Sequence, residues 1–261
     1  MKTHEAIYKR KSIRKYKDSG IEPDIMKKII DMSKGVSRLN ENIDMNIHIV
    51  YDGKRIHSLF KGIVSNYVKI KSPHYLVITS ENKENYLCNI GYTVENLVLE
   101  MTTMGIGTCW VGAKFKKEEI KKIIDIQENQ EPVILVAFGE PEDFFNMYRD
   151  NISQFSRKKI DEVVVGKYDE DIKEILEAAR LSPSACNLQP WNFKIERSKI
   201  QVFRNFPRNV IKKKIAETYG DIDVGISISH ILRMCEHKNI CYEVIKDSIL
   251  DDNYVCSIKL C

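Results

Sequence analysis

Residues 181–191 read LSPSACNLQPW and lie between a helical pattern and an alternating, strand-like one. Pro183 and Pro190 restrict the backbone at both ends of a run of small residues and amides. A loop of this kind forms a rigid wall on which a flat ligand can rest, with hydrogen bonds offered by Ser184 and Asn187. The simpler alternative is a helix end followed by the start of a strand, with the tryptophan buried in the core.

The segments around this loop occur twice in the chain. Residues 25–50 match residues 171–196 in the order helix, loop and strand, and residues 89–106 match residues 219–240 as a long apolar helix with glycine near its start. We interpret this as a duplication that divides the chain into two similar halves. The proline–tryptophan loop occurs only in the second half, which is expected to lack full equivalents of IGTCWVG (106–112) and of the last strand.

Hydrophobic periodicity predicts a mixture of helices and strands in both halves. The polar and aromatic stretch 142–160 is typical of an irregular connector. The predicted helices span residues 4–11, 23–35, 54–70, 86–104, 116–126, 169–181 and 221–238, and the predicted strands span residues 45–51, 74–80, 106–112, 131–141, 191–196, 199–205 and 241–247.

Composition excludes several classes of protein. The chain has 261 residues, 43% apolar and 30% charged, which allows one large domain or two modest ones. Its formal net charge of +4 is too small to argue for nucleic acid as a partner. The longest clean apolar run, Val133–Phe138, is far shorter than the roughly 18 residues of a membrane span. Because the first residues lack the apolar segment of a signal peptide, we expect a cytoplasmic protein with no membrane partner.

The cysteines do not form a recognisable pattern. Seven cysteines with scattered spacing argue against a disulfide framework. Cys235, His237 and Cys241 come nearest to a metal-ligand cluster, but no second pair completes it, so no metal is expected. No Cys–His or Ser–His–Asp arrangement indicates a nucleophilic enzyme.

A basic segment near the start of the chain, YKRKSIRKY (8–16), is a second candidate for function. Arg10 and Arg14 are four residues apart, so on a helix they would share one face, with Ser12 near the turn that ends the helix. Two guanidinium groups and a hydroxyl can hold a phosphate by charge-assisted hydrogen bonds. The alternatives are a solvated basic helix face and a nucleic-acid patch, of which the second is disfavoured because no aromatic stacking series accompanies it.

A third candidate is the glycine-flanked segment GIGTCWVG (105–112). Its glycine spacing is not the dinucleotide-binding fingerprint, and it follows a predicted helix where that fingerprint follows a strand. We therefore expect no Rossmann site. The segment is instead expected to be extended, with backbone N–H groups that can face a ligand.

Together the three motifs resemble those of the nitroreductase family of flavoproteins, and the resemblance spans nearly the whole chain. The family motif Arg-Arg-Ser-x-Arg-x-Phe/Tyr is matched by Arg10, Lys11, Ser12, Arg14 and Tyr16. The motif Pro-Ser-x-x-Asn-x-Gln-Pro-Trp is matched at every fixed position by Pro183, Ser184, Asn187, Gln189, Pro190 and Trp191. The motif Gly-Leu-Gly-Thr-Cys-Trp is matched by residues 105–110.

This resemblance implies a nitroreductase-like α+β fold. Two similar halves, residues 1–155 and 156–261, would each have a central, mostly antiparallel sheet flanked by helices, interlocked as an internal pseudo-dimer. In the family two subunits share the flavin site, so here a monomer would hold one FMN built across its halves. Residues 35–46 stand where the first half would carry its own loop and contain neither proline nor tryptophan. The second site is therefore expected to be degenerate.

The resemblance also implies roles for individual residues. Arg10, Lys11 and Ser12 would lie at the flavin phosphate, and Arg14 would lie near the pyrimidine edge in support of the reduced flavin. The late basic residue that also reaches the phosphate is matched by Arg157. Phe155 stands where the family often has a second basic residue. The ring would rest against Pro183, Ser184, Ala185 and Asn187, with the backbone of Val111 and Gly112 near the flavin N5 and Cys186 in a packing or wall role.

The function implied is that of an FMN-dependent oxidoreductase. It would take hydride from NADH or NADPH onto the flavin N5 and pass electrons to a small-molecule acceptor such as a nitroaromatic or a quinone. No side chain need act as nucleophile or base, because the flavin carries the chemistry. Two alternatives remain open: a flavin-binding or storage protein with little turnover, and a regulatory pseudo-enzyme.

Overall fold

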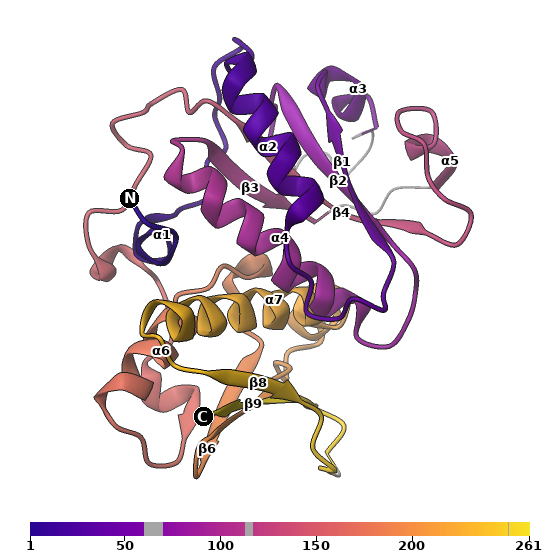
Figure 1. The fold of residues 1–261 in the computed structure, drawn as a ribbon. Helices are drawn as coiled ribbons and strands as arrows, with labels where there is room; N and C mark the ends of the chain where they lie inside the picture. Colours follow the sequence, from indigo (N-terminus) through magenta and orange to yellow (C-terminus); the bar gives the residue numbers. More distant parts are fainter. Residues whose placement is uncertain (60–69, 113–116, 250) are drawn as a thin grey trace. The chain divides into compact units, whose positions relative to one another are not determined.

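The computed structural model describes residues 1–59, 70–112, 117–249 and 251–261, and the chain forms two compact units (Figure 1). Unit 1 comprises Met1–Tyr86 and Asn96–Asp150, and unit 2 comprises Leu87–Glu95 and Asn151–Cys261. One long helix therefore contributes its first part to unit 2 and its second part to unit 1. The predicted halves, 1–155 and 156–261, assign this helix to the first half alone.

Unit 1 contains a four-stranded antiparallel sheet in the order β1-β2-β4-β3. The register places Ile47 opposite Ile78, and Val77 opposite Leu135. The elements are α1 (Thr3–Lys9), α2 (Pro23–Gly35), β1 (Met45–Val50), α3 (Gly53–His57), β2 (His74–Ser80), α4 (Tyr86–Thr103, shared with unit 2), β3 (Gly107–Val111), α5 (Lys117–Ile120) and β4 (Glu131–Gly139).

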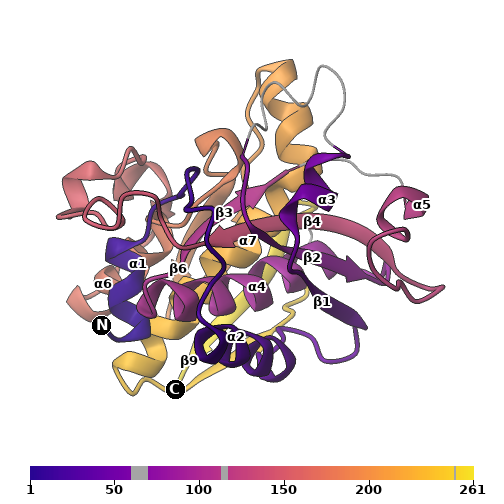
Figure 2. The same cartoon turned by 90° about the horizontal axis from the view of Figure 1, so that it is seen from above.

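The sheet of unit 1 is covered on both faces. Every residue of β2 is buried, as expected for a central strand between two layers. Figures 1 and 2 show α2 on one face of the sheet and α3 on the other. Tyr75 and Val77 point to the α3 side, where they pack with Ile56 and Leu135 in one apolar cluster. Because successive strand residues alternate between faces, the neighbouring residues of β2 point to the α2 side.

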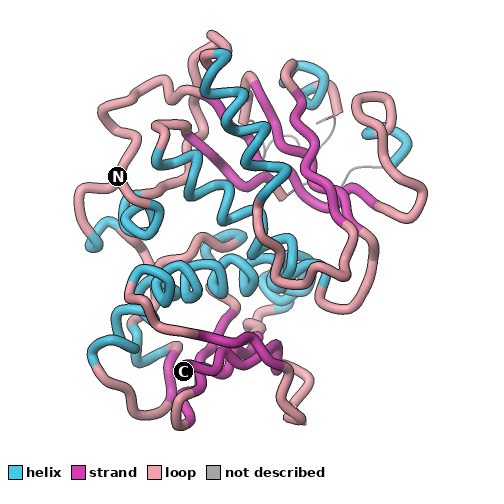
Figure 3. Tube along the Cα trace, viewed as in Figure 1, coloured by secondary structure: helices cyan, strands magenta, loops and turns pink. Residues whose placement is uncertain are grey.

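Unit 2 contains a five-stranded sheet in the order β5-β6-β7-β9-β8. The short β5 pairs with β6 in parallel, and all other neighbours are antiparallel. The helices of this unit are drawn in cyan and its strands in magenta in Figure 3. The elements are η2 (Ile152–Gln154), η3 (Ile160–Glu162), β5 (Val164–Val165), α6 (Glu170–Arg180), η4 (Ala185–Asn187), β6 (Trp191–Glu196), β7 (Lys199–Arg204), α7 (Val210–His237), β8 (Tyr242–Ile245) and β9 (Tyr254–Leu260).

The two sheets share one strand order. In unit 1 the order is β1-β2-β4-β3, and in unit 2 the order β6-β7-β9-β8 repeats it, with a helix before the first strand and a long helix after the second. The predicted α+β class is confirmed. The second half was expected to lack full equivalents of IGTCWVG and of the last strand. The structure differs, because β8, which lies within the predicted strand 241–247, and β9 take the places of β3 and β4. The shared order supports a duplication, which itself stays a prediction.

Two glycines allow a close helix crossing inside unit 2. A Cβ on Gly91 would lie 2.0 Å from the carbonyl oxygen of Ile222, and a Cβ on Gly225 would lie 2.0 Å from the carbonyl oxygen of Cys88. Each helix thus presents a glycine to the other helix's backbone. Glycine inside a helix costs about 0.5–1 kcal/mol relative to alanine, and this contact gives a reason for Gly91 near the start of α4 and for Gly225 in the middle of α7.

Several predicted helix boundaries differ from the structure. α7 begins at Val210, eleven residues before the predicted start, and its first turns are largely exposed, with Val210 and Ile211 open to solvent. α5 ends at Ile120 where the prediction extended to residue 126. Most of the predicted helix 54–70 lies outside the described residues. None of the helices in the described part of the chain is long and apolar enough to cross a membrane.

Candidate functional site

The basic segment after α1 is extended, not helical. α1 ends at Lys9, and Arg10 at its C-terminal cap has φ −61° and ψ 136°. Ser12 then bridges Thr108 of β3 in parallel, and the N–H of Ile13 donates to the carbonyl of Thr108 at 2.9 Å. The prediction that Arg10 and Arg14 share one helix face is therefore wrong, because backbone pairing with β3 replaces the last turn.

Gly107 permits this pairing. A Cβ at that position would come within 2.9 Å of the Ile13 side chain. The segment therefore lies directly on β3, and the glycine of the third sequence motif serves the packing of the first.

Arg10 has a second arginine as its neighbour, which the sequence patterns did not indicate. The guanidinium of Arg10 is buried, with only 5% of the residue exposed. Arg149 Nη1 donates to the carbonyl oxygen of Arg10, and its backbone N–H donates to the carbonyl of Lys9 at 2.8 Å. Burial, together with the nearby charge of Arg10, lowers the pKa of Arg149 to about 10. Unit 1 thus holds a buried and a half-buried guanidinium group as neighbours, an arrangement suited to a phosphate.

The other predicted site residues of unit 1 differ in exposure and in their hydrogen bonds. Lys11 Nζ donates to Asn146 Oδ1 at 2.5 Å, and Arg14 is exposed. Val111 is buried at the end of β3, whereas Gly112 is exposed. Within the described ranges the hydroxyl of Thr108 is buried and has no hydrogen-bond partner, so a polar group is left over where β3 meets the basic segment.

In unit 2 the loop between α6 and β6 has a constrained backbone. Cys186, Asn187 and Gln189 have φ values of 50°, 56° and 52°, in the left-handed region that non-glycine residues seldom adopt. Cys186 is exposed, so it has no packing role in the core. Trp191 is fully buried, as its alternative interpretation predicted.

Arg157 fastens this loop to the end of α6. Its Nε donates to the carbonyl of Ser182 at 3.0 Å, and its Nη2 donates to the carbonyl of Leu181 at 3.3 Å. Its Nη1 donates to Asn187 Oδ1 at 2.7 Å, and the amide of Asn187 donates to the carbonyl of Ser156 at 2.8 Å. Arg157 and Asn187, which were both predicted to contact a ligand, are therefore hydrogen-bonded to each other within unit 2.

A hydroxyl and a carboxyl group complete the support of the loop. The hydroxyl of Ser184 accepts from the N–H of Gln189 at 2.9 Å. The carboxyl of Asp223, on α7, accepts from the N–H of Ala185 at 3.0 and 3.1 Å. Asp223 is 4% exposed, and burial raises its pKa well above the ordinary value, against the opposing effects of the Ala185 N–H and the charge of Arg157. The sequence analysis missed Asp223, although an aspartate inside an apolar helix is itself a signal.

A buried histidine joins three helices at the base of the same loop. His230 Nδ1 lies 2.9 Å from the carbonyl oxygen of Ala178 and 3.0 Å from Ser182 Oγ, and Nε2 lies 3.3 Å from Glu95 Oε1. Because a carbonyl only accepts, Nδ1 carries a proton. Ser182, His230 and Glu95 are each at most 1% exposed. The row resembles a catalytic triad in composition, but its burial gives it a structural role.

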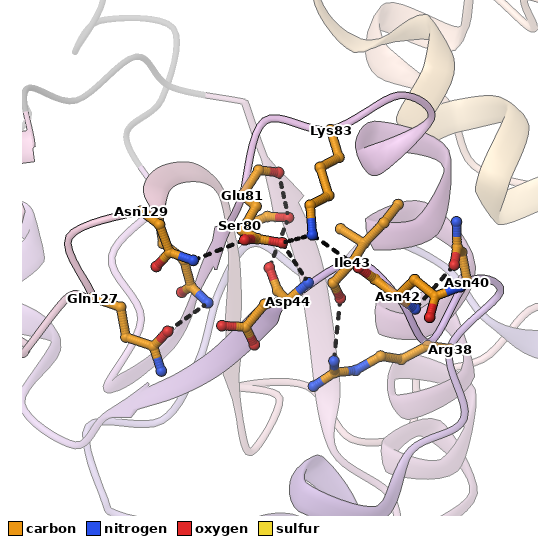
Figure 4. Close-up of polar contacts among 11 residues, drawn as sticks. Arg38, Asn40, Asn42, Ile43, Asp44, Ser80, Glu81, Lys83, Gln127 and Asn129 are labelled. Carbon is orange, nitrogen blue, oxygen red and sulfur yellow. Dashed lines mark hydrogen bonds and ion pairs between the residues drawn. The ribbon is translucent and has the colours of Figure 1, made fainter.

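The matching connection of unit 1, residues 36–44, is held differently (Figure 4). Arg38 Nη1 donates to the carbonyl of Ile43 at 3.2 Å, and Nη2 donates to the carbonyl of Met45 at 2.9 Å. No residue of this connection has a positive φ. This connection is therefore an ordinary turn whose backbone carbonyls accept hydrogen bonds from Arg38, a residue of the same turn.

A carboxylate completes that turn. Glu81 Oε2 accepts from the N–H of Asp44 at 3.1 Å, and Oε1 accepts from the amide of Asn129 at 2.8 Å. Lys83 Nζ lies 2.7 Å from Glu81 Oε2 and donates to the carbonyl of Asn42 at 3.1 Å (Figure 4). The hydrogen bond from Lys83 is the main cause that lowers the pKa of Glu81.

Comparison with known proteins identifies relatives of one kind. A family model described as "Putative TM nitroreductase" matches residues 2–235. A protein of Archaeoglobus fulgidus named "Putative NADH dehydrogenase/NAD(P)H nitroreductase" is 22% identical over 166 residues, which cover 59% of this chain and 95% of that protein.

Solved structures show the same fold. A crystal structure from Thermotoga maritima, described as a "putative nitroreductase", has a TM-score of 0.65 and 20% identity, and the match covers 100% of this chain and 93% of that one. A nitroreductase with bound FMN from Desulfitobacterium hafniense has a TM-score of 0.50 and 15% identity, and the match covers 65% of this chain and all of that one.

Proposed function

Because the chain belongs to the TM nitroreductase family, we propose that it is an FMN-dependent oxidoreductase that takes hydride from NADH or NADPH and passes electrons to a nitroaromatic, a quinone or a similar acceptor. The name of the Archaeoglobus fulgidus relative supports a nicotinamide donor, and the FMN-bound Desulfitobacterium hafniense structure supports the flavin. FMN, when bound, supplies the capacity to accept a hydride and release electrons.

The arginine pair of unit 1 carries this proposal. A flavin mononucleotide ends in a phosphate, and the hydrogen-bond donors that bind this phosphate should be positively charged and partly shielded from water. Arg10 and Arg149 provide two guanidinium groups, and burial, followed by repulsion from Arg10, lowers the pKa of Arg149. A bound phosphate would relieve that repulsion and accept their N–H groups. Lys11 and Ser12 follow on the same segment and extend the donor set.

The loop of unit 2 supplies orientation, not charge. Arg157 and the side chain of Asn187 already bond to each other. What the loop offers a flat ring is therefore the surface of Pro183, Ser184 and Ala185, set in place by Asp223 from beneath. In this proposal Arg157 acts on the flavin by holding the loop's shape.

The first test is the colour and redox response of the purified protein. We expect a yellow protein whose flavin absorbance is bleached by NADH or NADPH without oxygen and restored by a quinone or a nitroaromatic. Arg149→Ala is expected to retain at least about tenfold less FMN through gel filtration, since a charge-assisted contact is worth about 1.5–3 kcal/mol. Lys15→Ala, which removes an exposed cation of the same segment, is the matched control and should retain FMN normally.

The remaining outcomes separate the alternatives. A colourless protein that takes up no FMN would overturn the proposal. A yellow protein that no nicotinamide bleaches would be a flavin-binding protein with little turnover, an alternative favoured by the internal bonding of Arg157, which leaves fewer donors for a phosphate. We further propose one FMN per monomer. Two per chain would contradict a degenerate second site, and normal FMN retention by both Arg14→Ala and Asn187→Ala would remove those residues from the site.

A further inference from the structure

Two exposed cysteines lie opposite each other at the ends of β8 and β9. The register of these strands pairs Tyr242 with Leu260 and Glu243 with Lys259. One step further along the same ladder brings Cys241 opposite Cys261, and the N–H of Cys261 donates to the carbonyl of Cys241 at 2.9 Å. The pairing therefore continues to both cysteines.

The geometry of such a pair fits a disulfide. Directly opposite residues that share antiparallel hydrogen bonds have Cα atoms about 5.5 Å apart, and disulfides join Cα atoms about 4.4–6.8 Å apart, most often near 5.5–6 Å. Opposite residues also project to the same face of the sheet. The side chain of Cys241 is the main cause that raises the pKa of Cys261, in agreement with two neighbouring thiols.

We propose that Cys241 and Cys261 form a reactive dithiol that small-molecule disulfides oxidise to an intramolecular disulfide. A thiolate of the pair attacks the oxidant, its S–S bond breaks, one small thiol leaves and a mixed disulfide forms. The second cysteine then attacks the protein sulfur of the mixed disulfide and releases the second small thiol. The pair loses two electrons and two protons, and the oxidant is reduced to two thiols.

The other cysteines provide internal standards. Cys186 is also exposed, and the structure shows no thiol partner for it among the described residues. Cys88, Cys109, Cys235 and Cys256 are buried, and burial raises the pKa of Cys235 and Cys256 to about 12, so these thiols stay protonated and inert. The reactivity of the dithiol can thus be compared, within one molecule, with that of a single exposed thiol and with that of buried thiols.

The test exposes the fully reduced, full-length protein to oxidised glutathione and maps each cysteine by mass spectrometry. We expect residues 241 and 261 to lose two hydrogen atoms together and to keep no glutathione, while Cys186 gains one glutathione. Half-conversion of the pair should need roughly tenfold less oxidant than that of Cys186, because the second exchange is intramolecular.

Two serine variants complete the test. Cys241→Ser and Cys261→Ser should each leave the surviving cysteine of the pair carrying glutathione, as Cys186 does. The proposal is overturned if both cysteines carry glutathione in the unaltered protein, if the disulfide forms between two chains on a non-reducing gel, or if the pair and Cys186 react at the same oxidant concentration.

Discussion

The connections before β1 and before β6, residues 36–44 in unit 1 and 181–190 in unit 2, occupy the same place in the same strand order. The first is a turn with ordinary backbone, held by Arg38 and an exposed cluster around Glu81. The second forces three residues to positive φ and is held from beneath by a buried carboxyl and from the side by Arg157.

The difference shows what a shaped loop requires. Three left-handed non-glycine residues cost of order 1–3 kcal/mol each and persist only where the surroundings over-determine them. The loop of unit 2 has those surroundings in α7 and Arg157. The connection of unit 1 has no residue at positive φ, and Arg38 and the cluster around Glu81 are enough to hold it.

The largest expected effect comes from the helix that carries Asp223. Gly225→Ala would place a Cβ 2.0 Å from the backbone of Cys88, so α7 must shift, at a cost of about 3 kcal/mol or more. Chemical denaturation should show this loss, and amide exchange should rise in 181–190 and not in 36–44. Gly35→Ala is the control, because a Cβ there meets nothing within 4 Å, and it should be neutral or slightly stabilising. An equally stable Gly225→Ala protein would contradict the tight crossing.

The two arginines allow a direct comparison of the connections. Arg157→Ala leaves the carbonyls of Leu181 and Ser182 without their donor and should lower the free energy of unfolding by about 2–3 kcal/mol. Arg38→Ala should cost about 1 kcal/mol, because its turn is more open to water. Limited proteolysis should cut the 181–190 loop only in the first variant. Equal losses of unfolding free energy in the two variants would mean that the two connections are supported equally strongly.

A pH series tests the buried carboxyl. The folded-state pKa of Asp223 is raised, so its contribution to stability is complete below the unfolded value of about 3.9 and is lost as pH rises through the folded value. Asp223→Asn keeps an acceptor for the Ala185 N–H and does not titrate. Its stability relative to the unaltered protein should therefore improve as pH rises, measured by denaturant titration. Asp223→Ala, which removes the acceptor, should be less stable than Asp223→Asn at every pH. If the stability difference between the unaltered protein and Asp223→Asn does not change with pH, the pKa of Asp223 is not raised.

The smallest effect is expected in the polar cluster of unit 1. Lys83→Ala removes an exposed ion-pair partner of Glu81, and such pairs add little because water and salt screen them. The melting temperature should fall slightly at low ionic strength and match that of the unaltered protein in high salt. A large, salt-independent loss would mean that the connection of unit 1 is supported as strongly as its counterpart.

Local signals made much of the fold predictable. Pro23 and Gly35 mark the ends of α2, and the apolar run 74–80 coincides with β2. β9 was missed because Ser257 and Lys259 interrupt its apolar residues, so the segment lacks a continuous apolar run.

The supports of the candidate site were less accessible to sequence reasoning. The motif gave Arg10 and Asn187, but Arg149 lies 139 positions from Arg10 in sequence, and no spacing rule connects such residues. Glu95 and His230 are likewise 135 positions apart, so no spacing rule connects them either. The role expected for Arg157 came from the family resemblance, whereas its hydrogen bonds to the end of α6 depend on where the chain turns after Ser182.

The division of α4 between the units also bears on the order in which the chain folds during synthesis. Leu87–Glu95 belongs to unit 2 and meets α7 at Gly91, yet more than one hundred residues separate Glu95 from Ile222. At about 5–20 residues per second, the ribosome needs on the order of ten seconds to make them. For that interval the nascent chain carries an apolar turn without its covering helix. Residues 151–261 therefore cannot complete unit 2 by themselves, because the unit also includes Leu87–Glu95, which are synthesised earlier.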